Sequence, residues 1–72
     1  MSRSFQIDQY TIFTIDTERE INFQVEENGN YLFRLVPGYE RFELSKLDQA
    51  LLAEIDYRLV GWIGDKIDRY FS

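Results

Sequence analysis

The side chains that most enzymes use for chemistry are absent from this 72-residue sequence. It contains no histidine and no cysteine, which removes the commonest general base and the strongest nucleophile. Its four serines, Ser2, Ser4, Ser45 and Ser72, include none that is followed by lysine at the Ser-x-x-Lys spacing. Thirteen acidic residues are spread along the chain without an evident pair. We therefore expect a protein that is not an enzyme.

Oxygen ligands that could hold a metal ion gather only in predicted turns. Residues 26–30 combine acidic and amide side chains with a glycine, but they lack the alternate acidic spacing and the distant glutamate of a calcium loop. Asp16, Glu18 and Glu20 surround a second predicted turn, where acidic residues are common without any metal. We expect no metal and no other cofactor.

The balance of charges argues against direct binding of nucleic acid. Thirteen acidic and eight basic residues give a net charge of −5. The basic residues are scattered, so no run of them could neutralise a phosphate backbone. The same charge leaves open a small acidic inhibitor that mimics nucleic acid, of the kind made by phages and mobile elements. It is equally the charge that solubility requires.

Alternation of apolar and polar residues predicts the elements that must position any site. Residues 20–26 and 31–36 each place apolar side chains at every second position, as strands with one buried face do. Asn28-Gly29 lies between them and is typical of a hairpin turn. The two segments therefore predict a pair of antiparallel strands.

The length of this turn sets which side chains share a face. A two-residue turn at Asn28-Gly29 would mix apolar and polar side chains on each face. We therefore expect a three-residue turn over residues 27–29, with Gly29 in the left-handed conformation and Phe23 opposite Phe33.

Residues 5–15 are rich in β-branched and aromatic side chains and predict a first strand. A three-residue turn after it would place Phe13 opposite Phe23. The core face of the resulting three-stranded meander is then expected to hold Phe13, Ile15, Ile21, Phe23, Val25, Tyr31, Phe33 and Leu35.

A fourth strand over residues 40–44 is an alternative that the sequence leaves open. Pairing it with residues 31–36 would put Arg34 directly opposite Arg41, which is unfavourable for like charges. With or without it, residues 1–72 are expected to form one small domain, because a chain of this length has no room for a second.

The last third of the chain predicts an amphipathic helix over residues 46–71. Ser45 and Asp48 have the spacing of a capping box, and apolar residues recur beyond them at intervals of three and four. Gly61 and Gly64 lie inside this helix, so a break near them is an alternative. The expected fold class is α+β: an antiparallel meander of three or four strands with a C-terminal helix packed on one face.

Two sets of apolar residues have no evident place in so small a core. One set lies at the end of the predicted helix and comprises Trp62, Ile63, Ile67, Tyr70 and Phe71. Trp and Tyr beside Arg in this segment have the composition of an interface hot spot. The other is expected on the sheet face that points away from the helix; it comprises Tyr10, Ile12 and Leu32. Both sets are candidate protein-binding residues. Packing of the first set within its own chain, and ordinary exposure of the second, are the alternatives.

The functional hypothesis is a non-catalytic protein–protein interaction or regulatory module. Its partner is either another protein or a second copy of the chain in a homodimer. No apolar run approaches the ~20 residues of a membrane span, and no membrane partner is expected. The absence of cysteine agrees with a soluble, cytoplasmic protein.

Overall fold

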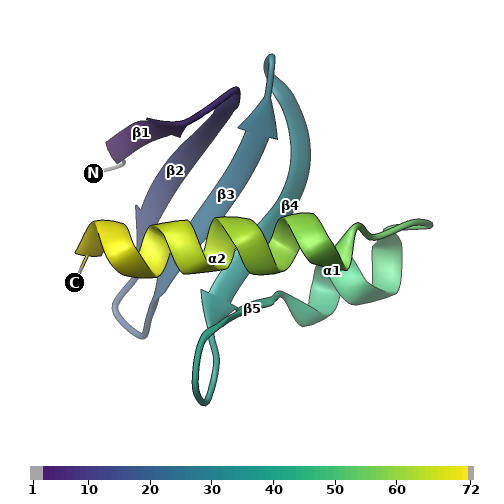
Figure 1. The fold of residues 1–72 in the computed structure, drawn as a ribbon. Helices are drawn as coiled ribbons and strands as arrows, with labels where there is room; N and C mark the ends of the chain where they lie inside the picture. The colour runs from purple at the N-terminus through teal and green to yellow at the C-terminus, as the bar shows by residue number, and fades with distance from the viewer. Residues whose placement is uncertain (1–2, 72) are drawn as a thin grey trace.

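A computed structural model describes residues 3–71 as a sheet with one long helix across one of its faces (Figure 1). Each strand pairs antiparallel with the next along the chain, in the order β1-β2-β3-β4-β5. The elements are β1 (Arg3–Ile7), β2 (Tyr10–Asp16), β3 (Ile21–Glu27), β4 (Asn30–Pro37), β5 (Phe42–Leu44), α1 (Lys46–Leu51) and α2 (Tyr57–Phe71). The predicted α+β class, a meander followed by a helix on one face, is confirmed.

The predicted first strand is two strands, which raises the number of strands to five. The chain reverses at Asp8 and Gln9, so that Ile7 pairs with Tyr10. Asp8 adopts a left-handed conformation with φ of 52°, which aspartate tolerates better than most residues because its short side chain can bond locally. The sequence has no glycine or proline at this position, so the turn carries no strong local signal.

The hairpin between β3 and β4 has a two-residue turn rather than the expected three-residue turn. Asn28 and Gly29 both have positive φ, of 53° and 80°, so the left-handed Gly29 is confirmed while the predicted register is wrong. A β-bulge restores the alternation that such a turn would otherwise spoil. Val25 pairs with Phe33 and Glu26 with Tyr31, which leaves the intervening residue of β4 without a partner.

The predicted register between the first two strands is also wrong, by one residue. Phe23 lies opposite Thr14 rather than Phe13. The connection from β2 to β3 is four residues long, and Thr17 closes it: its backbone N–H donates to the carbonyl of Glu20 at 3.0 Å, and its hydroxyl accepts from the Glu20 N–H at 3.1 Å. A slip of one residue turns every side chain over, so Ile12 faces the core.

The fourth predicted strand is present as β5 but is shorter than residues 40–44. Leu44 pairs with Leu35 in β4, and Phe42 pairs with Pro37. The loop before β5 is closed by a hydrogen bond of 2.9 Å from the Gly38 N–H to the Arg41 carbonyl. Arg41 therefore lies in the loop, and the unfavourable pairing of two arginines does not arise.

The predicted helix over residues 46–71 is two helices, and its break lies earlier than Gly61 and Gly64. α1 ends where Leu52 turns extended, with φ of −79° and ψ of 128°. α2 begins after Asp56, whose Oδ1 accepts the backbone N–H groups of Arg58 and Leu59 at 3.1 and 3.2 Å. These bonds satisfy donors that the first turn of a helix leaves unpaired. α2 then continues without interruption through both glycines to Phe71.

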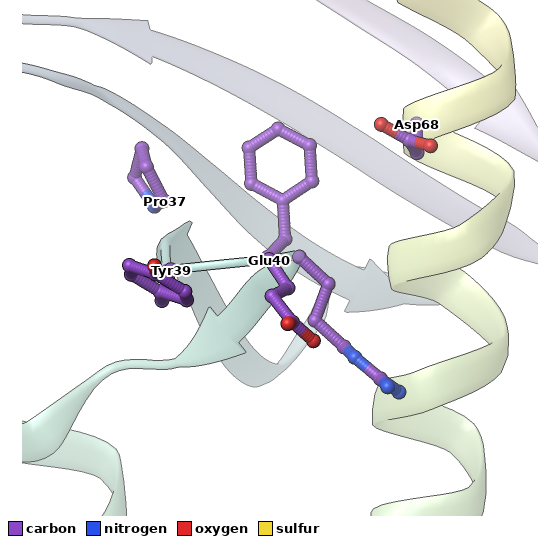
Figure 2. A pocket seen from close by; sticks show the side chains of 7 residues that line it. Pro37, Tyr39, Glu40 and Asp68 are labelled. Atoms are coloured by element: carbon purple, nitrogen blue, oxygen red, sulfur yellow. The ribbon is translucent and has the colours of Figure 1, made fainter.

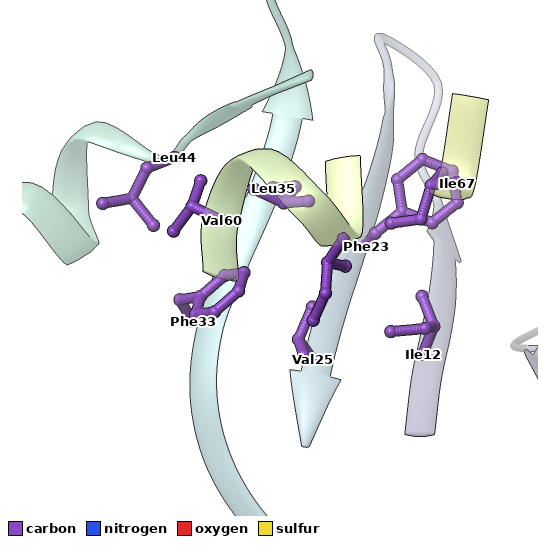
Figure 3. Close-up of a cluster of buried hydrophobic side chains, with 9 residues drawn as sticks. Ile12, Phe23, Val25, Phe33, Leu35, Leu44, Val60 and Ile67 are labelled. Carbon is purple, nitrogen blue, oxygen red and sulfur yellow. The ribbon is translucent and has the colours of Figure 1, made fainter. Parts of the chain in front are cut away.

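The core lies between α2 and the sheet face that it covers. α2 turns apolar side chains at intervals of three and four toward the strands. Figure 3 shows these side chains meeting residues of β2 to β5; the buried cluster is Ile12, Phe23, Val25, Phe33, Leu35, Leu44, Val60, Ile63 and Ile67. No helix within residues 3–71 is both long enough and apolar enough to cross a membrane.

Candidate functional site

Three of the eight predicted protein-binding residues have no exposed surface. Ile12, Ile63 and Ile67 each have a relative exposure of 0%, so the expectation that they present a contact surface is wrong. Ile12 is buried because the register of β2 turns it toward α2. Ile63 and Ile67 are buried because they lie on the face of α2 that packs on the sheet.

Leu32 also lies on the covered side of the sheet rather than on its open face. It is the unpaired residue of the bulge in β4 and is half-buried against the core. The predicted apolar set on the open face, Tyr10, Ile12 and Leu32, therefore does not form, because all three side chains pack on the side that α2 covers.

The remaining four predicted residues lie at two places along α2: Tyr10 beside Trp62, and Tyr70 beside Phe71 in the last turn. Tyr70 and Phe71 are 61% and 54% exposed, and Trp62 is 38% exposed. Tyr10 of β2 meets Trp62 edge to face, with ring centroids 6.3 Å apart. Phe5 of β1 joins this group, which we call the aromatic stripe: Phe5, Tyr10, Trp62, Tyr70 and Phe71.

Ring contacts fix the stripe against the sheet. The rings of Phe5 and Tyr70 stack with centroids 4.1 Å apart and planes 5° from parallel. Phe71 reaches further inward, to within 5.6 Å of the buried ring of Phe23. The Lys66 ammonium lies 5.5 Å from the centre of the Trp62 ring, close enough for a cation–π contact. These contacts thus hold the stripe in place on its inner side, while much of its outer surface stays exposed.

The stripe borders an edge of the sheet. β1 pairs with β2 on one side, and within residues 3–71 no strand lies on its other side. An edge strand presents a row of backbone N–H and carbonyl groups that can pair with another chain. Backbone and aromatic surface therefore lie side by side along β1.

The open face of the sheet carries a different set of side chains. Phe13 and Ile15 of β2 lie there half-buried, opposite Gln24 and Asn22 of β3. Next to them, Arg34 donates from Nη2 to Oε1 of Gln24 at 3.2 Å. These polar neighbours shield the apolar residues, so this face is less suited to a strong contact than the aromatic stripe.

A buried carboxylate fastens α1 to the middle of β4. Asp48 is only 5% exposed, and its Oδ2 accepts the Arg34 backbone N–H at 2.7 Å and the Ser45 hydroxyl at 2.8 Å. Its Oδ1 accepts the Tyr31 hydroxyl at 2.9 Å. Burial and this hydrogen bond raise the pKa of Tyr31 to about 12. The cluster is structural in its geometry, since each group is bonded to another part of the same chain.

Sequence reasoning recognised the Ser45–Asp48 capping box, and the structure confirms that the Asp48 N–H donates to the Ser45 hydroxyl at 3.2 Å. It missed the burial of the Asp48 carboxylate and the place of Phe5 in the stripe. Both depend on partners distant in sequence, for which no local pattern exists.

A shallow pocket of about 200 Å³ lies at the other edge of the sheet (Figure 2). Asp68 of α2 faces it from one side, and the loop from β4 to β5 forms the other. Tyr39 in this loop is 97% exposed and has no ring contact among those described above. It offers an exposed aromatic residue at the far edge from the stripe.

Comparison with protein-family models, with curated proteins and with solved structures finds no match for the chain.

Proposed function

We propose that the chain is a non-catalytic interaction module whose first partner is a second copy of itself, docked through the aromatic stripe and the free edge of β1. The observation that carries the proposal is this pairing of exposed rings with an unpaired strand edge. Aromatic side chains supply large contact areas at low entropic cost, and strand pairing fixes their register.

A two-fold axis through β1 would bring the two stripes together. Antiparallel pairing of β1 with its copy extends the sheet across both chains, and the contact is isologous, as in most dimers. A register centred on Phe5 would place the two Phe5–Tyr70 stacks next to each other. A stable interface needs about 800 Å² from each partner, which is roughly one-seventh of the 5545 Å² that the chain exposes.

Light scattering at micromolar and near-millimolar concentration tests the proposal. We expect a dimer at the higher concentration, together with slower amide hydrogen exchange in β1. Trp62 is the only tryptophan, so its fluorescence should shift to shorter wavelength as the dimer forms.

Variants distinguish this specific contact from nonspecific association through exposed aromatic residues. Tyr70→Ala and Trp62→Ala should dissociate the dimer and leave the far-ultraviolet circular dichroism of the sheet unchanged. Tyr39→Ala is the matched control, because it removes an even more exposed ring at the opposite edge. A strict monomer at both concentrations, or equal loss of the dimer in Tyr39→Ala, would refute self-association through the stripe.

A further inference from the structure

An apolar pocket lies between β4 and the connection from α1 to α2, apart from the stripe. Its volume is about 170 Å³. The bulge at Leu32 helps to form it, because this extra residue widens β4 where the connection crosses. Its apolar lining consists of Leu32, Phe33, Leu52, Ile55 and Leu59.

Two carboxylates complete the lining of this pocket. Glu54 and Asp56 both line it, and both residues are exposed. Asp56 is held in place because its Oδ1 caps α2, so its charge stays at the start of the helix. Glu54 lies in the connection rather than on α2, so the i,i+4 match with Arg58 that a continuous helix would provide is lost.

Further carboxylates lie beyond the pocket, near Tyr10. The pKa of Tyr10 is raised first by burial and then by three carboxylates, those of Glu27, Asp56 and Asp8. Glu27 is bonded to Gln9 across the neighbouring turns, with the Gln9 Nε2 donating to Oε2 at 3.0 Å. The carboxylates of Glu27 and Asp8 therefore lie on the same side of the molecule as that of Asp56.

We propose that the pocket receives the side chain of a lysine or arginine from a basic segment of a partner protein. Such side chains combine a long apolar stem with a charged tip. The stem would lie among Leu32, Leu52 and Leu59, and the tip would pair with the carboxylates of Glu54 and Asp56. A purely apolar side chain would fill the pocket without using these charges, and an acidic one would be repelled.

The two parts of this complementarity can be tested with two short peptides. Hexalysine and the hexamer of 2,4-diaminobutyrate carry the same charge at pH 6.5, but the second has a stem two methylenes shorter. Binding is followed by the NMR shifts of the methyl groups of Leu52, Ile55 and Leu59. We expect these methyl groups to move with hexalysine, and the shorter peptide to bind about fourfold more weakly for each methylene that leaves the pocket.

Charge variants test the carboxylates. The double variant Glu54→Gln with Asp56→Asn should bind hexalysine at least fivefold more weakly, and asparagine keeps the helix cap. The matched control, Glu18→Gln with Glu40→Gln, removes the same charge from exposed positions elsewhere and should bind normally. If the double variant fails to fold, Glu54→Gln alone serves, since Glu54 lies in no helix.

Three results would overturn the proposal: equal weakening in the control variant, equal affinity for the two peptides, or no shift at the three methyl groups. The first two would indicate attraction by net charge alone, and the third would show that the peptide does not enter the pocket. Trp62→Ala should keep its affinity for hexalysine, so failure of this proposal and failure of self-association can be told apart.

Discussion

The two consecutive helices after β5 are attached to the sheet by different interactions. α2 is held by apolar side chains, with Ile63 and Ile67 completely buried. α1 buries the carboxylate of Asp48, while Leu47 and Leu51 are 65% and 71% exposed. Regularly spaced apolar residues in the sequence therefore lie on the buried face of α2 but on the exposed face of α1.

The difference arises where β5 ends, because β4 still needs hydrogen-bond partners there. Ser45 donates its N–H to the Arg34 carbonyl at 2.9 Å, as a further strand residue would. Its own carbonyl instead accepts the Gln49 N–H at 3.1 Å and starts α1. The Asp48 carboxylate then accepts the Arg34 N–H at 2.7 Å. A side chain therefore supplies the acceptor that the backbone of a continuing strand would have supplied. A buried donor left without such an acceptor would be costly.

Truncating one apolar residue in each helix should show the contrast most clearly. Ile63→Ala should lower the free energy of unfolding by about 2–5 kcal/mol, because it leaves a cavity between α2 and the sheet. Leu51→Ala should change it by no more than about 0.5 kcal/mol. Urea unfolding monitored by circular dichroism gives both values, and similar costs would mean that α1 packs through its leucines after all.

Removing the polar anchor of α1 should have the next largest effect. Asp48→Ala should cost about 1.5–3 kcal/mol, since hydrogen bonds to a charged acceptor are lost and the Arg34 N–H is left unpaired. The same unfolding experiment measures it. Asp48→Asn, which keeps one acceptor oxygen, should fall between this variant and the unchanged protein; a neutral Asp48→Ala would remove the basis of the comparison.

Glycine replacement tests where the helical segment breaks. Gly61 lies inside α2, and a Cβ there would meet nothing within 4 Å, so Gly61→Ala should stabilise the protein by about 1 kcal/mol. Gly29→Ala should destabilise it by about the same amount, because φ of +80° is unfavourable for alanine. Thermal unfolding should show a higher melting temperature for Gly61→Ala and a lower one for Gly29→Ala. If the helix bends at Gly61, Gly61→Ala should instead lower the melting temperature.

The smallest expected effect is a loss of stability at high pH through Tyr31, because this side chain is 45% exposed and solvent screens its interaction with Asp48. Its pKa is 10.0 in the unfolded chain and about 12 in the folded one. The folded state therefore keeps the proton longer, and this contribution is present below pH 10 and disappears as the pH rises toward 12. Tyr31→Phe should flatten the pH dependence of the unfolding free energy over this range. The raised pKa of Tyr10 stays in the variant, so a residual slope is expected.

Much of the fold follows from local sequence. The regular alternation along β3 identifies its buried face, because polar residues occupy every second position. Asn28-Gly29 specifies a reversal because both residues accept positive φ. Ser45 specifies a helix start because its hydroxyl can accept from the N–H three residues later. Each of these signals acts over a few residues.

The candidate sites were only partly predictable. Trp62, Tyr70 and Phe71 are exposed as the hypothesis requires, because Trp62 lies off the buried line of α2 and the other two lie in its last turn. The acidic pocket had no counterpart in the sequence, because it needs the bulge at Leu32 beside a connection that begins twenty residues later.

The amino-acid sequence by itself determined the class of the fold, the β3–β4 reversal and the helix cap, since each depends on residues within one turn or strand. Tertiary structure decided the face of β2, where Tyr10 and Ile12 compete with Phe13 and Ile15 for burial and both parities are apolar. It also decided the division of the helical segment, because the two helices bury different groups: α1 the carboxylate of Asp48, and α2 the side chains of Ile63 and Ile67. The spacing of apolar residues predicts which residues share a face of an element. The pairing of elements that are distant in sequence determines which of the two faces is buried.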